Sequence, residues 1–149
     1  MFKGVFGSIF AVGAALCLFA LTGCGSSSED TLTKAEFEKQ AAAICKEAEA
    51  KRVKLISALV KEADPKGDVE AQQEQLIKKA MPTYEEAAQQ IDELGAPDGQ
   101  EKKVEALVEA MEEAAEKSNS DPHTAVVSSI FFRKADQLAK EFKLTGCVI

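Results

Sequence analysis

Apolar residues recur at intervals of three and four positions along most of the chain after residue 32. This spacing is typical of one face of an α-helix. No segment of useful length shows the strict alternation of apolar and polar residues that indicates a half-buried strand. The pattern therefore predicts an all-α fold with four helices. Short connections favour antiparallel neighbours, so we expect an up-down four-helix bundle.

The first predicted helix begins at a capping box formed by Thr33 and Glu36, whose side chains can accept hydrogen bonds from backbone N–H groups in the first turn. It ends before the Asp-Pro-Lys-Gly turn at residues 64–67. Its expected inner face consists of Phe37, Ala41, Ile44, Cys45, Ala48, Leu55, Ile56 and Leu59.

The second predicted helix covers residues 69–94 and contains Pro82. Proline usually kinks or breaks a helix, but the apolar stripe keeps its helical spacing through this position, so we expect a kink with Pro82 on the solvent side. If the helix breaks instead, residues 83–86 can cap its restart. The expected inner face consists of Leu76, Ala80, Tyr84, Ala87, Ile91 and Leu94.

A turn at residues 95–99 precedes the third predicted helix, which ends at residues 118–120. The fourth opens with Asp121 as N-cap and Pro122 at the first helical position, and we expect it to end at Gly146. The expected inner residues of the third helix are Val104, Leu107, Val108, Met111, Ala114 and Ala115, and those of the fourth are Val127, Phe131, Ala135, Leu138 and Phe142.

The first 23 residues have a basic start at Lys3 and an apolar stretch over residues 5–21, which is the layout of a secretory signal. The stretch ends in Leu-Thr-Gly before Cys24, and this motif resembles the signal of bacterial lipoproteins. In that family the motif cysteine takes a diacylglycerol and the preceding peptide is removed. The resemblance implies a protein anchored by lipid at Cys24 to the extracytoplasmic face of a cell membrane or envelope.

This interpretation divides the chain into a signal peptide (1–23), an acylated cysteine with a flexible tether (24–31) and a helical domain (32–149). The tether contains Gly, Ser and acidic residues and has almost nothing apolar to bury. An uncleaved membrane anchor is the alternative, because the apolar run is near the lower limit of about 17 residues for a spanning helix. Three glycines within residues 4–21 (Gly4, Gly7 and Gly13) and a small residue before Cys24 favour cleavage.

Four cysteines are present, but Cys17 would leave with the signal and Cys24 would carry lipid. The remaining pair, Cys45 and Cys147, has a single connectivity, and disulfides persist in exported domains. Two free buried thiols are the alternative. A second resemblance involves Phe37, the Ala-Ala-Ala-Ile-Cys segment that ends at Cys45, and the Ala-Lys-Glu-Phe-Lys-Leu segment at residues 139–144, which Cys147 follows. These features resemble small exported helical proteins, many of them actinobacterial lipoproteins and mostly uncharacterised. That resemblance implies the same disulfide and names no reaction.

The net charge is −7, and it becomes −8 once Lys3 is removed with the signal. A domain this acidic is unsuited to nucleic acid, whose phosphates are bound by clustered lysine and arginine. It is equally unsuited to an electrostatic contact with anionic lipid headgroups. We therefore expect membrane attachment through the lipid at Cys24 and no nucleic-acid partner.

The sequence offers little for catalysis. Its single histidine, His123, lies beside a helix cap, and there is no nucleophile elbow, phosphate-binding glycine loop or nucleotide fingerprint. The Glu-X-X-His pairs of di-iron bundles are absent too, and the imidazole and thiolate ligands that select transition metals are scarce. We expect neither an enzyme nor a bound metal or cofactor.

An acidic ridge recurs along one flank of the third predicted helix. A solvated flank facing lysines of a neighbouring helix is the main interpretation, because like charges at this spacing oppose a helix and need compensation. A basic partner or a weakly held divalent cation is the alternative. The ridge consists of Glu101, Glu105, Glu109, Glu112 and Glu116.

Two polar residues fall on predicted inner faces, Arg52 in the first helix and Gln73 in the second. Arg52 either lays its stem on the core with its head in water or binds an acidic group in a polar pocket. The function we expect is a structural or protein-interaction module. The alternative is a small-ligand-binding lipoprotein with a polar pocket near Arg52 and Gln73.

Overall fold

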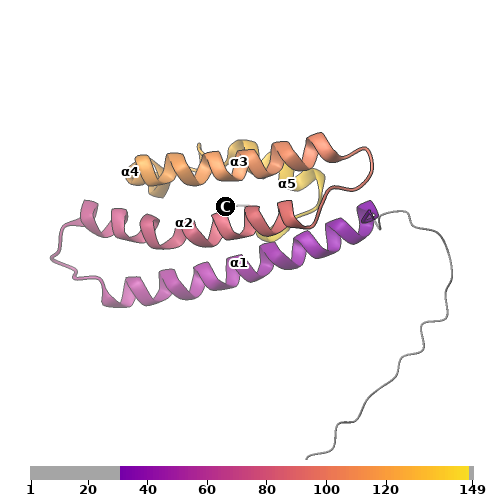
Figure 1. Ribbon diagram of the computed structural model, residues 1–149. Helices are drawn as coiled ribbons and strands as arrows, with labels where there is room; N and C mark the ends of the chain where they lie inside the picture. Colours follow the sequence, from indigo (N-terminus) through magenta and orange to yellow (C-terminus); the bar gives the residue numbers. More distant parts are fainter. Residues whose placement is uncertain (1–30, 148–149) are drawn as a thin grey trace, which may run out of the picture.

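The computed structural model describes residues 31–147 (Figure 1). The predicted signal peptide, Cys24 and most of the tether lie outside these residues. All regular secondary structure in the described residues is helical and none is a strand, which confirms the all-α fold class. Its elements are α1 (Lys34–Glu62), α2 (Val69–Glu93), α3 (Glu101–Ser120), α4 (Pro122–Val127), α5 (Arg133–Glu141) and the 3-10 helix η1 (Thr145–Cys147).

The predicted helix starts are confirmed by their caps. Thr33 and Glu36 form both hydrogen bonds of the capping box at α1. The Asp121 carboxylate accepts from the N–H of Thr124 at 3.0 Å, with Pro122 in the first turn of α4. These local interactions satisfy N–H groups that have no partner inside the helix.

The long helices pack side by side, with α2 between α1 and α3 (Figure 1). The short helix α4 contacts α2 and α3, α5 packs on α3, and η1 packs on α1. Alanine is the commonest buried residue, and its small side chain lets helix axes approach closely. The buried alanines are Ala41, Ala48, Ala80, Ala87, Ala88, Ala110, Ala114, Ala115, Ala135 and Ala139.

Helix α2 runs through Pro82 without a break, as its apolar stripe predicts. Pro82 is exposed, so the carbonyl that loses its usual N–H partner can be solvated. In the same turn the Thr83 hydroxyl donates to the carbonyl of Ala80 at 2.7 Å.

The prediction of a single fourth helix is wrong, because residues 128–132 separate α4 from α5. Two valines and two serines occupy residues 126–129. Valine is stiff in a helix, and serine side chains compete for backbone hydrogen bonds. Ser128 is extended (φ −148°, ψ 137°), and its hydroxyl accepts from the N–H of Ile130 at 3.3 Å.

This interruption changes which residues face the core. Val127 is 64% exposed and Phe131 is half-buried, whereas Phe132 is buried. Phe132 packs edge-on against Tyr84 of α2, with the ring centroids 5.6 Å apart. The other predicted inner residues of this segment are Ala135 and Phe142, which are buried, and Leu138, which is half-buried.

The sequence predicted that the last helix ends at Gly146, and this prediction is wrong. Helix α5 ends earlier, with Lys143 in the left-handed region (φ 59°). The N–H of Leu144 donates to the carbonyl of Ala139 at 2.9 Å, and the N–H of Lys143 donates to that of Lys140 at 3.1 Å. This pair of bonds is a Schellman motif, usually formed around glycine.

Gly146 instead permits close contact between η1 and α1. A Cβ atom built there would lie 2.8 Å from the carbonyl carbon of Cys45 and from the backbone nitrogen of Lys46. No L-residue with a side chain fits without movement of a helix backbone. Glycine at this position therefore sets the distance between the C-terminal segment and α1.

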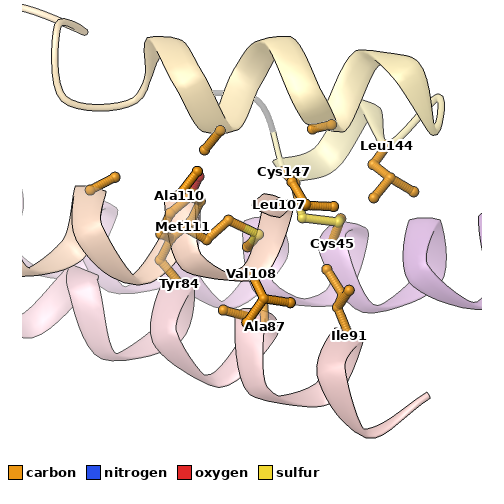
Figure 2. Packing of buried hydrophobic residues seen from close by; sticks show 14 of the residues in the cluster. Cys45, Tyr84, Ala87, Ile91, Leu107, Val108, Ala110, Met111, Leu144 and Cys147 are labelled. Atoms are coloured by element: carbon orange, nitrogen blue, oxygen red, sulfur yellow. A yellow bond between two sulfur atoms is a disulfide. The ribbon is translucent and has the colours of Figure 1, made fainter. Parts of the chain in front are cut away.

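The predicted pair of cysteines meets at this contact. Cys45 and Cys147 form a disulfide with their Cα atoms 4.8 Å apart, inside the cluster of buried residues that Figure 2 shows. The bond joins positions 102 residues apart. For a closed loop of about 100 residues the chain-entropy model gives about 4.7 kcal/mol of stabilisation as an upper guide.

We predict that reduction of the disulfide lowers the free energy of unfolding by about 2 to 4 kcal/mol. Intact mass spectrometry should show a gain of two hydrogens on reduction, with a fall in melting temperature. The double variant Cys45→Ala with Cys147→Ala should have the melting temperature of the reduced wild type, and reductant should not change it. Alkylation of both thiols in native, unreduced protein would contradict this expectation.

We predict that Gly146→Ala destabilises the protein by about 1 to 3 kcal/mol, because the added methyl group overpacks the contact with α1. Thr145→Ala is the matched control, since Thr145 is exposed in the same turn. Urea denaturation of the two oxidised variants compares them directly. Equal stability of Gly146→Ala and wild type would show that η1 can move away from α1 without cost.

Candidate functional site

Exposed apolar side chains gather at one end of the molecule. Within residues 31–147, every large apolar side chain that is exposed belongs to the second half of α1, the start of α2, or α4 and the link after it. Figure 1 places α4 and the α1–α2 turn at the same end, which we call the distal end. These residues are Val53, Val60, Val69, Val126, Val127 and Ile130.

The second half of α1 lacks cover on part of its surface. All of its fully buried residues, from Phe37 to Ala48, lie in its first half, where η1 and the disulfide are attached. Leu55, Ile56 and Leu59 were expected in the core but are half-buried. The short α4 packs on α2 and α3 instead of extending along α1, which explains the difference.

A groove of about 560 Å³ opens between the end of α1 and the start of α2. We call it the distal groove. Its volume is within the usual range of about 300 to 1,000 Å³ for ligand pockets. The lining residues are Leu59, Val60, Glu62, Ala63, Asp64, Gly67, Asp68, Val69, Ala71, Gln72, Gln73, Gln75 and Leu76.

Hydrogen bonds hold the turn that closes this groove. The Asp64 carbonyl accepts from the N–H of Gly67 at 2.9 Å and from the side-chain amide of Gln72 at 3.0 Å. The Asp64 carboxylate accepts from the N–H of Lys66 at 2.9 Å. Asp68 caps α2 by accepting from the N–H groups of its first turn. The groove therefore has a fixed end wall.

The two polar residues singled out in the sequence do not share a pocket. Gln73 lines the distal groove, and its side-chain oxygen lies 3.2 Å from Nδ1 of His123 on α4. Arg52 is half-buried on α1 and does not line the groove. Its charge acts instead on Tyr84, a buried residue of α2.

Tyr84 carries a hydroxyl that is buried without a hydrogen-bond partner among the described residues. Burial raises the pKa of this phenol well above its ordinary value of 10.0. The negative charge of Asp136 on α5 raises the pKa further, and the positive charge of Arg52 lowers it. The phenol is therefore neutral in the folded protein at neutral pH.

The acidic ridge of α3 is exposed along its whole length. Glu101 accepts from the N–H of Gly99 at 2.9 Å, and backbone hydrogen bonds lower its pKa. The other four ridge carboxylates form no ion pair with a residue of the described chain, whereas their neighbour Glu113 pairs with Lys117 and lies 3.9 Å from Lys134. The expected lysine partners are thus not at contact distance.

Within the described residues no group of three or more histidine, cysteine or acidic side chains is arranged to hold a metal ion. A search of the same residues finds no helix with the length and apolar character needed to cross a membrane. Comparison with protein-family models, curated proteins and solved structures finds no match to this chain.

Sequence reasoning missed the groove itself. It placed Val60 and Val69 outside the apolar stripes and gave them no role. The available signal was that Val60 and Val69 are aliphatic and lie on either side of the turn at residues 64–67. Neither residue lies on the stripe that joins α1 to α2, and yet both line the groove.

We predict that Tyr84→Phe raises the free energy of unfolding by about 1 kcal/mol, because it removes a buried polar group that has no partner. Tyr84 is the single tyrosine, and the chain has no tryptophan. Absorbance at alkaline pH therefore reports on this phenol alone. In the folded protein the phenolate signal should be absent at pH 10.

The raised pKa fixes the sign of the pH dependence. The contribution of the neutral phenol to stability is complete below the ordinary pKa of 10.0 and is lost as the pH rises toward the folded-state value. Stability of the wild type should therefore fall more steeply above pH 10 than that of Tyr84→Phe. Phenolate formation in the folded protein at pH 10 would refute the burial of this hydroxyl.

Proposed function

We propose that this protein is a lipid-anchored, extracytoplasmic interaction module. Acyl chains at Cys24 hold it to the membrane, residues 1–23 are removed as a signal, and the tether separates the folded domain from the lipid surface. In this proposal α4 and α5 together take the place of the fourth helix of an up-down bundle. The protein catalyses no reaction and carries no cofactor.

The gathering of exposed apolar side chains at the distal end is the observation that supports this proposal best. All the exposed large apolar side chains of the described residues lie toward this end, and none lies at the end that contains the disulfide. Helix α1 has 29 residues, which at the usual rise corresponds to about 43 Å. The apolar end therefore lies far from Thr33, near which the chain leaves toward Cys24. A protein tethered through its N-terminus would present this end away from the membrane.

A small-ligand-binding lipoprotein is the second candidate, and the distal groove favours it. The groove has the volume of a ligand pocket and includes the side-chain amides of Gln72, Gln73 and Gln75. The predicted pocket around Arg52 is not part of it. The two candidates differ in what contacts the distal end in the cell: a protein or a small molecule.

We predict that wild-type protein incorporates a fatty-acid analogue in bacteria and that Cys24→Ala does not. The mass of the wild type should correspond to a chain that begins at Cys24 and carries lipid. An unlabelled wild-type protein that still contains residues 1–23 would refute lipid anchoring and support an uncleaved membrane segment.

Photo-cross-linking in intact cells tests the proposed interaction with a partner protein. A cross-linking amino acid at Val60, on the distal end, should give a discrete protein adduct. The same amino acid at Glu109, exposed on α3, is the matched control and should give none. Adducts from both positions or from neither would refute a partner site at the distal end, and the second result would favour a small ligand.

A further inference from the structure

We infer that the distal groove binds an amphipathic helix of a partner protein whose apolar face is flanked by lysine or arginine. This inference rests on the proposed function, because it names the chemistry of the partner. The shape of the groove, its charge and its solvent-exposed apolar walls support it independently.

One wall of the groove has the residue spacing of a helix face. Val69, Gln72, Gln73 and Leu76 line one wall, and their spacing of i, i+3, i+4 and i+7 spans two turns of α2. Leu59, Val60 and Ala63 line the facing wall on α1. An amphipathic helix binds between two such walls through anchors with the same spacing.

The apolar walls are available to a partner. Val60 is 62% exposed and Val69 is 66% exposed, although both border the groove. Burial of these side chains by a partner would remove apolar area from water, which stabilises a complex by about 25 cal/mol per Å² before the cost of association. The half-buried Leu59 and Leu76 form the deeper part of the groove.

The acidic residues of the groove favour a basic partner. Three acidic residues line it, Glu62, Asp64 and Asp68, and no lysine or arginine does. The carboxylates of Asp64 and Asp68 keep their negative charge while they accept from backbone N–H groups. None of the three forms an ion pair with a residue in the described part of the chain. Opposite charge around an apolar contact speeds association and disfavours wrong partners.

The same charges argue against two other occupants. An anionic membrane surface would be repelled by the carboxylates and by the net charge of −7. A second copy bound through the same end would bring the carboxylates of both subunits together, because a two-fold interface places identical patches face to face. A basic helix meets neither obstacle.

Two model peptides test this inference. One is an 18-residue fluorescent helix with leucines at i, i+3, i+4 and i+7 spacing and lysines elsewhere. The other keeps the leucines and replaces every lysine with glutamate. Binding is measured by anisotropy to the protein as cells produce it, held in phosphatidylcholine nanodiscs, with empty nanodiscs as background. We expect the lysine peptide to bind at least tenfold more tightly than the glutamate peptide.

Variants locate the binding site. Val60→Ser and Val69→Ser should each weaken binding of the lysine peptide at least fivefold. Ala43→Ser is the control, because Ala43 is exposed on the first half of α1 and does not line the groove, and it should bind like wild type. Glu62→Gln changes charge without removing apolar surface. It should weaken binding in low salt and reduce its salt dependence.

Equal binding of both peptides would overturn the inference, as would equal effects of Val60→Ser and Ala43→Ser. Binding of dodecyltrimethylammonium without any binding of the lysine peptide would overturn it in favour of a small cationic amphiphile. Because the nanodisc holds the protein either through acyl chains at Cys24 or through an uncleaved segment at residues 1–23, these results do not depend on lipidation. Cells that show lipid anchoring and a cross-linked partner would leave the proposed function intact if both peptides failed.

Discussion

The contact between η1 and α1 is the constraint on which the arrangement of the chain depends. Two surfaces meet there without room for a side chain, and a covalent bond joins them. The ring of Phe142, just before η1, packs edge-on against Phe37 of α1 at 5.3 Å. The C-terminal segment thereby covers the first half of α1, a position in which a longer last helix would have had to lie.

This constraint makes the two ends of the bundle different. At one end, η1, the ring of Phe142 and the disulfide cover one face of the first half of α1. At the other end, α4 is too short to reach α1 and packs on α2 and α3. The apolar residues of the second half of α1 therefore stay partly in water. The interruption at residues 128–132 thus leaves apolar residues of α1 partly exposed, although it makes no extensive contact with α1.

Local signals predicted most of the fold. The cap at Thr33 and the apolar stripes predicted the first three helices, and the cap at Asp121 predicted the start of α4, because each signal acts within one or two turns. The sequence Val-Val-Ser-Ser at residues 126–129 is a local signal for the interruption after α4, but the burial of Phe132 rather than Phe131 beside Tyr84 depends on packing between helices and was missed. Gly146 and Val60 were misjudged for the same reason: their neighbours come from elsewhere in the chain. Of the predicted contact residues, Gln73 lies in the candidate site, and Arg52 and the ridge of α3 do not.

A long helix enclosed along half of its length cannot be uniformly stable. Local opening costs little where few apolar contacts are broken, so we expect residues 50–62 of α1 to open more readily than the half that contains Cys45. The disulfide fixes the first half of α1, and no comparable bond holds the second half among the described residues. A partner that binds the second half of α1 must also supply the free energy that orders it. Its affinity would reflect this cost as much as the contacts made.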